Sequence, residues 1–260
     1  MSQSKQLPAV FKIGGALVDN QTSLDALFIQ IAQLTTLGRP AIIVHGGGCF
    51  VDQQLGAQGF KTQKHEGQRI TPVEQMPIIA GVLSGYVNKS LVATAQKHGL
   101  KAIGLSLIDG QMTTTTDVDQ LGCVAETSPA DPSLLISLLS RGYIPVISSI
   151  AATADGKLRN VNADIAARTV AELIQGELIL LTDTAGVLDA EKNTIPLLDH
   201  TLASQLVADG VIQQGMKVKI DAALAAAKTL RRSIAVVDWR QPERLTNQFP
   251  SIAANTRVTC

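Results

Sequence analysis

Short apolar runs alternate with longer segments of helical periodicity along most of the chain. Between the first two runs, Leu24, Leu27, Phe28 and Ile31 recur at helical spacing in a segment that ends at Gly38. This pattern predicts a strand, a helix and a second strand in succession. The runs with the length and composition of buried strands are 9–13, 41–44, 102–105, 144–148, 178–182 and 234–237.

Local signals predict the remaining elements. The stretch from Thr71 to Glu74 has the pattern of a capping box, so a helix should begin there, with a kink expected at Pro77. Asp155-Gly156 indicates a hairpin turn, and the threonine tract 113–116 favours a strand. Further helices are predicted at 132–142, 163–174 and 216–230.

The order of these elements predicts an α/β protein. Strands that alternate with helices over short connections imply a three-layer sandwich, in which helices cover both faces of a central, mostly parallel sheet. We expect two lobes, 1–175 and 176–260. Ligands of such sheets bind beyond the carboxyl ends of the strands, so the loops after Ile13, Val44 and Thr182 are the candidate site.

Composition narrows the class of protein. The 260 residues are 45% hydrophobic and 17% charged, with 22 basic and 22 acidic side chains, which is typical of a folded soluble protein and gives no basic surface for nucleic acid. Aromatic residues, at 3%, are too few for base stacking. The three cysteines are scattered, which favours a reducing compartment and argues against a zinc site.

The N-terminal segment and the apolar runs indicate where the protein resides. The first residues are polar and lack the apolar stretch of a signal peptide, and no apolar run approaches the roughly 18 residues that a membrane span needs. We therefore expect a cytoplasmic protein that has no contact with membranes, and we expect no resident metal ligands.

Two glycine-rich turns follow the first two strands. Lys12 precedes Gly14 and Gly15, and His45 precedes Gly46–Gly48. Glycines expose backbone N–H groups, and a lysine or a helix N-terminus beside them attracts an anion. A phosphoryl group held from two sides would explain both turns. His45 is expected to form hydrogen bonds that shape the loop, without a catalytic role. Neither turn matches the Walker A or dinucleotide-binding pattern.

Polar clusters occupy three other junctions. Arg69 stands between a turn and the predicted helix start, and Asn160, Asn162 and Asp164 precede the helix 163–174. One of the latter three can cap that helix, which leaves the others for a site. Thr182-Asp183-Thr184 follows the fifth strand. On the helix 216–230, Lys217 and Lys219 lie on opposite flanks of the apolar stripe, and periodicity does not choose between them.

Together, in this order and at these intervals, the segments resemble the amino-acid kinase family, over almost the whole chain. The segments are Lys12–Gly15, His45–Gly48, Gly67–Thr71, Asn160–Asp164, Thr182–Leu188 and Gly215–Lys219. The second, third and fourth point to the branch of the family that acts on N-acetyl-L-glutamate. The resemblance implies the amino-acid kinase fold and phosphoryl transfer from ATP, with Mg²⁺ carried on the ATP phosphates, as in the second step of arginine biosynthesis.

The resemblance also implies roles for individual residues. Lys12 and Lys219 would flank the phosphoryl group in transfer, and Asp164 would hold both lysines. Substrate binding would fall to Gly47, Gly48, Arg69 and Asn160, with Arg69 on the α-carboxylate. Nucleotide binding would fall to Gly14, Gly15, Asp183, Thr184, Ala185, Gly186, Val187, Leu188, Val211, Ile212 and Gln213. Lys217 and Pro77 depart from the family pattern.

The same resemblance leaves two alternative functions open and also implies an oligomeric state. The chain could be another kinase of the family, for instance one that acts on carbamate, or a nucleotide-binding regulator without activity. The presence of Lys12, Asp164 and Lys219 argues against the regulator. Only about ten residues precede the first strand, fewer than the N-terminal helix of hexameric, arginine-inhibited relatives, so we expect a homodimer without arginine feedback.

Overall fold

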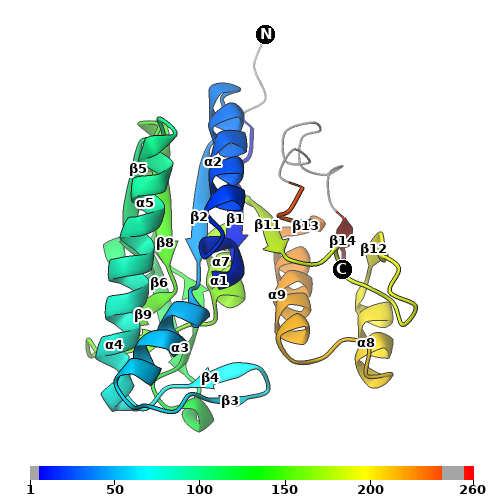
Figure 1. Cartoon of the computed structure of the whole chain (residues 1–260). Helices are drawn as coiled ribbons and strands as arrows, with labels where there is room; N and C mark the ends of the chain where they lie inside the picture. The colour runs from blue at the N-terminus through cyan, green and yellow to red at the C-terminus, as the bar shows by residue number, and fades with distance from the viewer. Residues whose placement is uncertain (1–5, 242–254) are drawn as a thin grey trace.

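A computed structural model describes residues 6–241 and 255–260 and centres on one eight-stranded sheet (Figure 1). The strand order is β12-β14-β13-β11-β1-β2-β8-β5, and every neighbouring pair is parallel except β13 and β14. All six predicted strands are present, and the predicted fold class is confirmed. The strands of the sheet are β1 (Ala9–Ile13), β2 (Ala41–His45), β5 (Ala102–Ser106), β8 (Ile144–Ser148), β11 (Glu177–Thr182), β12 (Leu197–Leu198), β13 (Ile234–Asp238) and β14 (Thr256–Val258).

Helices cover both faces of the sheet. The α-helices are α1 (Gly15–Val18), α2 (Gln21–Thr36), α3 (Gly48–Ala57), α4 (Met76–Ala80), α5 (Asn88–Lys97), α6 (Ser133–Ser140), α7 (Ala163–Leu173), α8 (His200–Ala208) and α9 (Gln214–Leu230). Short 3₁₀ turns are η1 (Val73–Gln75), η3 (Asp109–Gln111) and η4 (Asp119–Leu121), and a π-helical turn, η2 (Gly81–Val87), joins α4 to α5.

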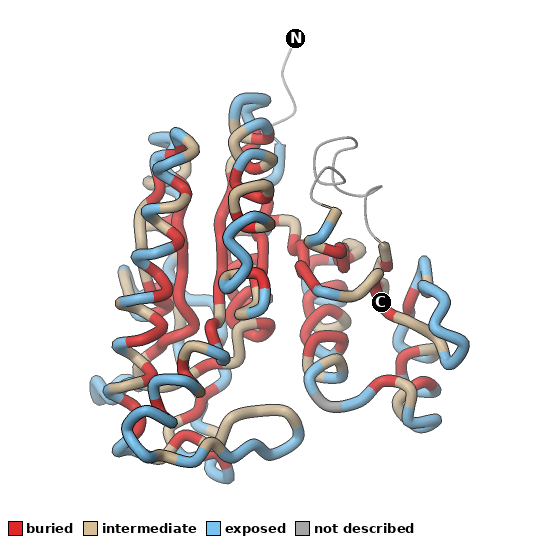
Figure 2. The backbone as a smooth tube through the Cα atoms, in the orientation of Figure 1, coloured by how far each residue is buried: buried red, intermediate tan, exposed pale blue. Residues whose placement is uncertain are grey.

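Alternate residues of the central strands build two separate cores. In β1, Phe11 and Ile13 pack with α2, α3, α4 and α5, whereas Val10 packs with α7, α8 and α9 on the other face. All five residues of β1 are buried, which is why the strand reads as a continuous apolar run (Figure 2). The only charged residue in that strand is Lys12, so its position is set by the core on either side.

Three hairpins lie outside the sheet. They are β3 (Gln63–His65) with β4 (Gln68–Ile70), β6 (Thr113–Asp117) with β7 (Ala125–Pro129), and β9 (Ile150–Ala152) with β10 (Leu158–Asn160). The predicted strand at the threonine tract and the predicted hairpin at Asp155-Gly156 are both present. β4 carries Arg69, and β10 carries Asn160.

Two details at the predicted capping box are wrong. A helical run does begin there, but its first residue follows Pro72, and no side chain caps it. Thr71 instead directs its hydroxyl to Asn160. Pro77 lies in the first turn of α4, where its missing N–H removes no hydrogen bond within that helix, and the helical run continues from it to Lys97.

The helical run that follows is long. By length and composition alone, Val73–Lys97 could cross a membrane. Its apolar face, which includes Ile79, Val87 and Leu91, is buried in the core against the sheet. This packing is that of a core helix.

The division into lobes at residue 175 stays a prediction, since the sheet runs without interruption from β2 through β1 to β11.

His45 closes β2 and is completely buried. Its Nδ1 lies 2.9 Å from the carbonyl oxygen of Gly46, and its Nε2 lies 3.0 Å from Nδ2 of Asn88. A neutral ring with the proton on Nδ1 satisfies both contacts, because it donates to the carbonyl and accepts from the amide. Burial lowers the pKa of His45 to about 4. The predicted hydrogen-bonding role is confirmed.

We predict that this histidine makes the fold sensitive to acid. Its pKa is lower in the folded chain than in the unfolded one, so the unfolded chain binds the extra proton between about pH 6.5 and 4. The stability contribution is complete above about 6.5 and falls by about 3 kcal/mol as the pH drops to about 4. Urea unfolding at several pH values should show this slope in the wild type and lack it in His45→Gln. Equal slopes in the two proteins would contradict the assignment.

Candidate active site

A cavity of about 230 Å³ opens at the carboxyl ends of β1 and β2. It is bordered by segments between Lys12 and Asp164, including the hairpin β3–β4 and the start of α7. Eight of the residues predicted from the sequence line it: Lys12, Gly14, Gly15, Gly47, Gly48, Arg69, Asn160 and Asp164. The structure therefore brings together the two glycine turns and two of the three polar clusters that the sequence analysis identified, those at Arg69 and at Asn160–Asp164.

Asp164 is the electrostatic centre of this cavity. Its Oδ1 accepts from Nζ of Lys12 at 3.0 Å and from Nζ of Lys219 at 3.1 Å. The three residues come from β1, α7 and α9. All three are less than 10% exposed. One carboxylate oxygen thus joins two ammonium groups that are more than 200 positions apart in the chain.

The charges of this triad support one another. Burial acts to raise the pKa of Asp164, but the two lysines outweigh it and keep that pKa below its ordinary value. Burial, assisted by the neighbouring Lys12, lowers the pKa of Lys219 to about 8, although Asp164 opposes the shift. At neutral pH the buried triad therefore pairs one carboxylate with two lysines, which leaves it with a net positive charge.

Asn162 leaves Asp164 free for this contact. The Asn162 side chain accepts hydrogen bonds from the backbone N–H groups of Asp164 and Ile165, and so caps α7. The sequence left open whether Asn162 or Asp164 was the cap. The structure divides the roles, with Asn162 satisfying the helix end and Asp164 satisfying the lysines.

The α9 helix separates its two lysines. Lys219 points into the buried side, whereas Lys217 is exposed and forms an ion pair of 2.8 Å with Asp221 one turn further along α9. Only Lys219 therefore contacts Asp164.

Arg69 is docked on the first turns of α3. One edge of its guanidinium contacts Asp52 at 2.7 Å and Thr62 at 3.1 Å, while Nη2 donates to the carbonyl oxygen of Gly48 at 3.3 Å. Thr62 in turn donates to Asp52. These contacts outweigh partial burial and lower the pKa of Asp52. Arg69 is held at the cavity wall with donors still available, because a guanidinium carries five N–H groups.

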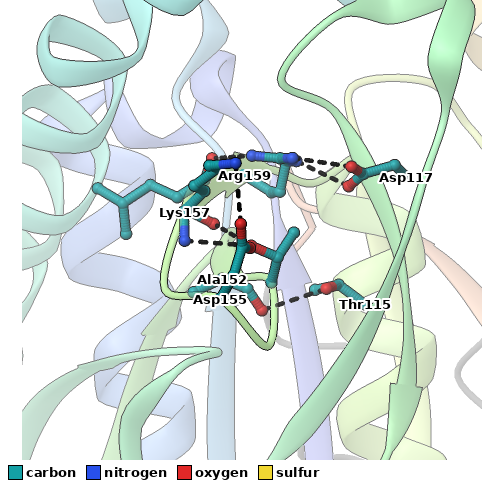
Figure 3. Close-up of polar contacts among 8 residues, drawn as sticks. Thr115, Asp117, Ala152, Asp155, Lys157 and Arg159 are labelled. Atoms are coloured by element: carbon teal, nitrogen blue, oxygen red, sulfur yellow. Dashed lines mark hydrogen bonds and ion pairs between the residues drawn. The ribbon is translucent and has the colours of Figure 1, made fainter.

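Asn160 reaches the cavity from the end of β10. Its backbone N–H donates to Cys123 at 2.9 Å, and its side-chain Nδ2 donates to the hydroxyl of Thr71 at 3.1 Å. The preceding residue, Arg159, forms a two-pronged ion pair with Asp117 on β6 (Figure 3). Backbone and side chain of Asn160 are therefore both fixed by neighbouring segments.

The segments predicted to bind nucleotide lie after β11 and before α9. Asp183 and Gln213 are exposed, Thr184, Ala185, Leu188 and Val211 are half-buried, and Gly186 is buried. Val187 and Ile212 are core side chains, so any contact they make with a ligand involves the backbone. The loop is anchored by Thr256, whose hydroxyl accepts from the N–H of Val187. These residues do not line the cavity around Asp164.

Several residues of the site were missed by the sequence reasoning. Asp52, Thr62 and Lys64 surround or face Arg69, and Lys64 lies directly opposite Arg69 in the hairpin. A single polar residue on a helix or hairpin is ordinarily solvent-exposed, so its type alone carries no signal. Only the pairing of β3 with β4 and the docking of Arg69 on α3 reveal these three.

Comparison with known proteins decides the family. The model of the amino acid kinase family matches residues 8–238. The chain belongs to the amino acid kinase family. It is 44% identical over 261 residues to the acetylglutamate kinase of Moritella profunda, across 100% of this chain and 99% of that protein. The acetylglutamate kinase of Shewanella loihica is 45% identical over 259 residues. The kinase class and the branch predicted from the sequence are confirmed.

Solved structures agree on the fold. The protein smu.665 from Streptococcus mutans UA159 superposes with a TM-score of 0.83 at 22% identity, over 97% of this chain and 98% of that one. The carbamate kinase of Giardia superposes with a TM-score of 0.65 at 13% identity, over 98% and 99% of the two chains. At these identities the likeness shows the fold alone, which the two kinds of kinase share.

Proposed function

We propose that this chain transfers the γ-phosphoryl group of ATP to the γ-carboxylate of N-acetyl-L-glutamate, giving N-acetyl-L-glutamyl 5-phosphate and ADP. The observation that carries the proposal is the contact of Lys12 and Lys219 with one oxygen of Asp164. Relatives at 44% and 45% identity along the whole chain bear the name acetylglutamate kinase. This reaction would be the second step of arginine biosynthesis, in the cytoplasm.

The chemistry requires positive charge and needs no base. A carboxylic acid with a pKa of about 4.3 is already ionised at neutral pH, so the nucleophile needs no deprotonation. Its oxygen forms a bond to the γ-phosphorus while the bond from that phosphorus to the β,γ-bridging oxygen breaks, and ADP leaves with the electron pair. The obstacle is the approach of one anion to another, which fixed cations relieve.

Each member of the triad then has a defined task. Lys12 and Lys219 stabilise the charge that spreads over the transferring phosphoryl oxygens. Asp164 holds both ammonium groups by one oxygen, and its lowered pKa keeps it ionised, so it organises the lysines without accepting a proton from the substrate. The N–H groups at the glycine turns of Gly14 and Gly47 add donors on either side of the cavity.

Acetylglutamate would bind between the hairpins β3–β4 and β9–β10. Arg69 would hold the α-carboxylate, since its fork matches a carboxylate and one edge is already fixed by Asp52. Asn160, Gly47 and Gly48 would supply the remaining hydrogen bonds. All four residues line one cavity with Lys12 and Asp164, so the γ-carboxylate of a substrate bound in this way would point toward Lys12.

ATP would lie over the loop Asp183–Leu188 and the segment Val211–Gln213, with its phosphates toward Lys12, Gly14 and Gly15. Mg²⁺ would arrive on the ATP phosphates and neutralise part of their charge. The residues fit that arrangement, because the one buried carboxylate of the cavity, Asp164, is engaged by two lysines and the other polar lining offers mainly cations and amides. Lobes 1–175 and 176–260 would hold the acceptor and the nucleotide respectively.

The two alternatives have less support. A carbamate pocket has no α-carboxylate to bind, yet Arg69 is fixed at the cavity wall by its contacts with Asp52 and with the carbonyl oxygen of Gly48. A silent regulator would not need the buried triad, which costs desolvation free energy for three charged groups. We also propose a homodimer without arginine feedback. A hexamer observed by light scattering would contradict that assembly.

Trapping the product tests the function. With ATP, Mg²⁺ and hydroxylamine, the wild type should form a hydroxamate from N-acetyl-L-glutamate and release ADP in proportion. Arg69→Ala should raise KM for acetylglutamate about 10- to 100-fold, because a charge-assisted pair to the α-carboxylate is lost. ADP release with carbamate and none with acetylglutamate, or a KM unchanged in Arg69→Ala, would overturn the substrate assignment.

The two lysines of α9 form a matched pair for the mechanism. Lys219→Ala should lower kcat by about 10²–10³, the usual loss for one group that stabilises charge in the transition state. Lys217→Ala should retain the kcat of the wild type, since that side chain is exposed and pairs with Asp221. Both can be measured in the hydroxamate assay with saturating substrates. Similar kcat values for the two variants would refute the assignment of Lys219.

A further inference from the structure

We propose that Thr71 is a positioning residue for substrate binding, because its hydroxyl fixes the side-chain amide of Asn160 toward the acetylglutamate site. This inference rests on the proposed function, and it adds a residue to which neither the sequence nor the family likeness gave a role. The sequence predicts Thr71 to be a helix cap and places it at the end of the segment Gly67–Thr71, but its side chain does not cap the helix.

Thr71 is completely buried, and both its backbone N–H and its carbonyl oxygen are hydrogen-bonded. Its backbone N–H donates to the carbonyl of Leu121 at 2.8 Å, and its carbonyl accepts from the N–H of Cys123 at 2.7 Å. The backbone of Thr71 is therefore clamped on both sides by the segment that links η4 to β7. The position of the hydroxyl is therefore restricted by these two backbone hydrogen bonds.

Gly122 makes that clamp possible. It adopts φ 72°, and a Cβ placed there would lie 2.5 Å from the carbonyl oxygen of Thr71. Any larger residue would both strain the backbone and push Thr71 away. The close approach of Gly122 to Thr71 is therefore built into the chain at this point.

Asn160 is tied to the same segment. Its backbone N–H donates to Cys123, next to Gly122, and its Nδ2 donates to the Thr71 hydroxyl at 3.1 Å. An amide can be placed in two orientations that exchange its oxygen and nitrogen. A hydroxyl can accept from Nδ2 or donate to Oδ1, so in either orientation it fixes the position of the amide. In the structure Nδ2 faces Thr71, which leaves Oδ1 and the second N–H for the cavity.

Thr71 also connects the two hairpins of the acceptor site. It follows the β4 strand that carries Arg69, and it contacts the last residue of β10. On its other side, β10 is pinned by the ion pair of Arg159 with Asp117 (Figure 3). The amide of Asn160 and the guanidinium of Arg69 are consequently held at a constant separation, as a ligand with a fixed spacing of polar groups requires.

Thr71→Val tests the proposal with Thr71→Ser as the rescue. Valine keeps the shape and removes the hydroxyl, so KM for acetylglutamate should rise about tenfold, while kcat and KM for ATP stay unchanged. Serine should restore the wild-type KM. Thr115→Val is the matched control, because it removes a hydroxyl that donates to the carbonyl of Ala152 in the β9–β10 hairpin and does not contact the Asn160 amide. The KM of this variant for acetylglutamate should equal that of the wild type.

Two further readouts separate positioning from a general loss of structure. In an Asn160→Ala background, Thr71→Val should raise KM no further, since the group it positions is gone. The side-chain amide signals of Asn160 in an NMR spectrum, assigned by their loss in Asn160→Asp, should shift in Thr71→Val and remain in place in Thr71→Ser.

These experiments distinguish a failure of the Thr71 proposal from a failure of the proposed function. A KM increase that persists in the Asn160→Ala background, equal effects of Val and Ser, or unshifted amide signals in Thr71→Val would each overturn the proposal. Failure of the wild type to use acetylglutamate would instead overturn the proposed function, and the NMR comparison would still determine whether Thr71 orients the amide.

Discussion

Burial of a charged triad is the constraint on which the rest of the site depends. Two ammonium groups in a confined cleft repel each other and lose hydration, and both effects would make them deprotonate or turn outward. A single oxygen of Asp164 prevents this by accepting from Lys12 and Lys219. The compensation is incomplete by design, because a net positive charge remains for the phosphoryl group.

The fold brings Lys12, Asp164 and Lys219, which are distant in the sequence, into contact at one carboxylate oxygen. The strand β1 lies at the middle of the sheet between β2 and β11, and the apolar residues on both faces hold Lys12 at the carboxyl end. The Asn162 cap fixes the start of α7, and the apolar stripe of α9 turns Lys219 inward. On the acceptor side, hydrogen bonds between hairpins replace the sheet as the source of rigidity.

Much of this was predictable from the sequence, for identifiable physical reasons. Buried parallel strands read as apolar runs, so all six were located, and glycine turns after strands marked the cavity. Periodicity placed Lys217 and Lys219 on opposite flanks of α9 but carried no information about which flank faces Asp164. The roles of Asp52 and Thr71 depend on contacts between segments 17 to 89 positions apart, which no local pattern encodes. At the capping box the local signal was overridden, because Asn160, a tertiary partner distant in the sequence, donates to the buried hydroxyl of Thr71.

The central claim is that fixed cations, and no general base, drive the transfer. The most direct measurement is the pH dependence of kcat in the wild type and in Asp164→Asn with saturating substrates. The account predicts a kcat that stays level from about pH 5.5 to 7.5 in the wild type. In the variant kcat should be lower and should fall further as the pH rises, because the Lys219 ammonium loses the support of the Asp164 charge. A decline of kcat toward acid with an apparent pKa near neutrality, absent in Asp164→Asn, would show that Asp164 acts as a base and would contradict the account.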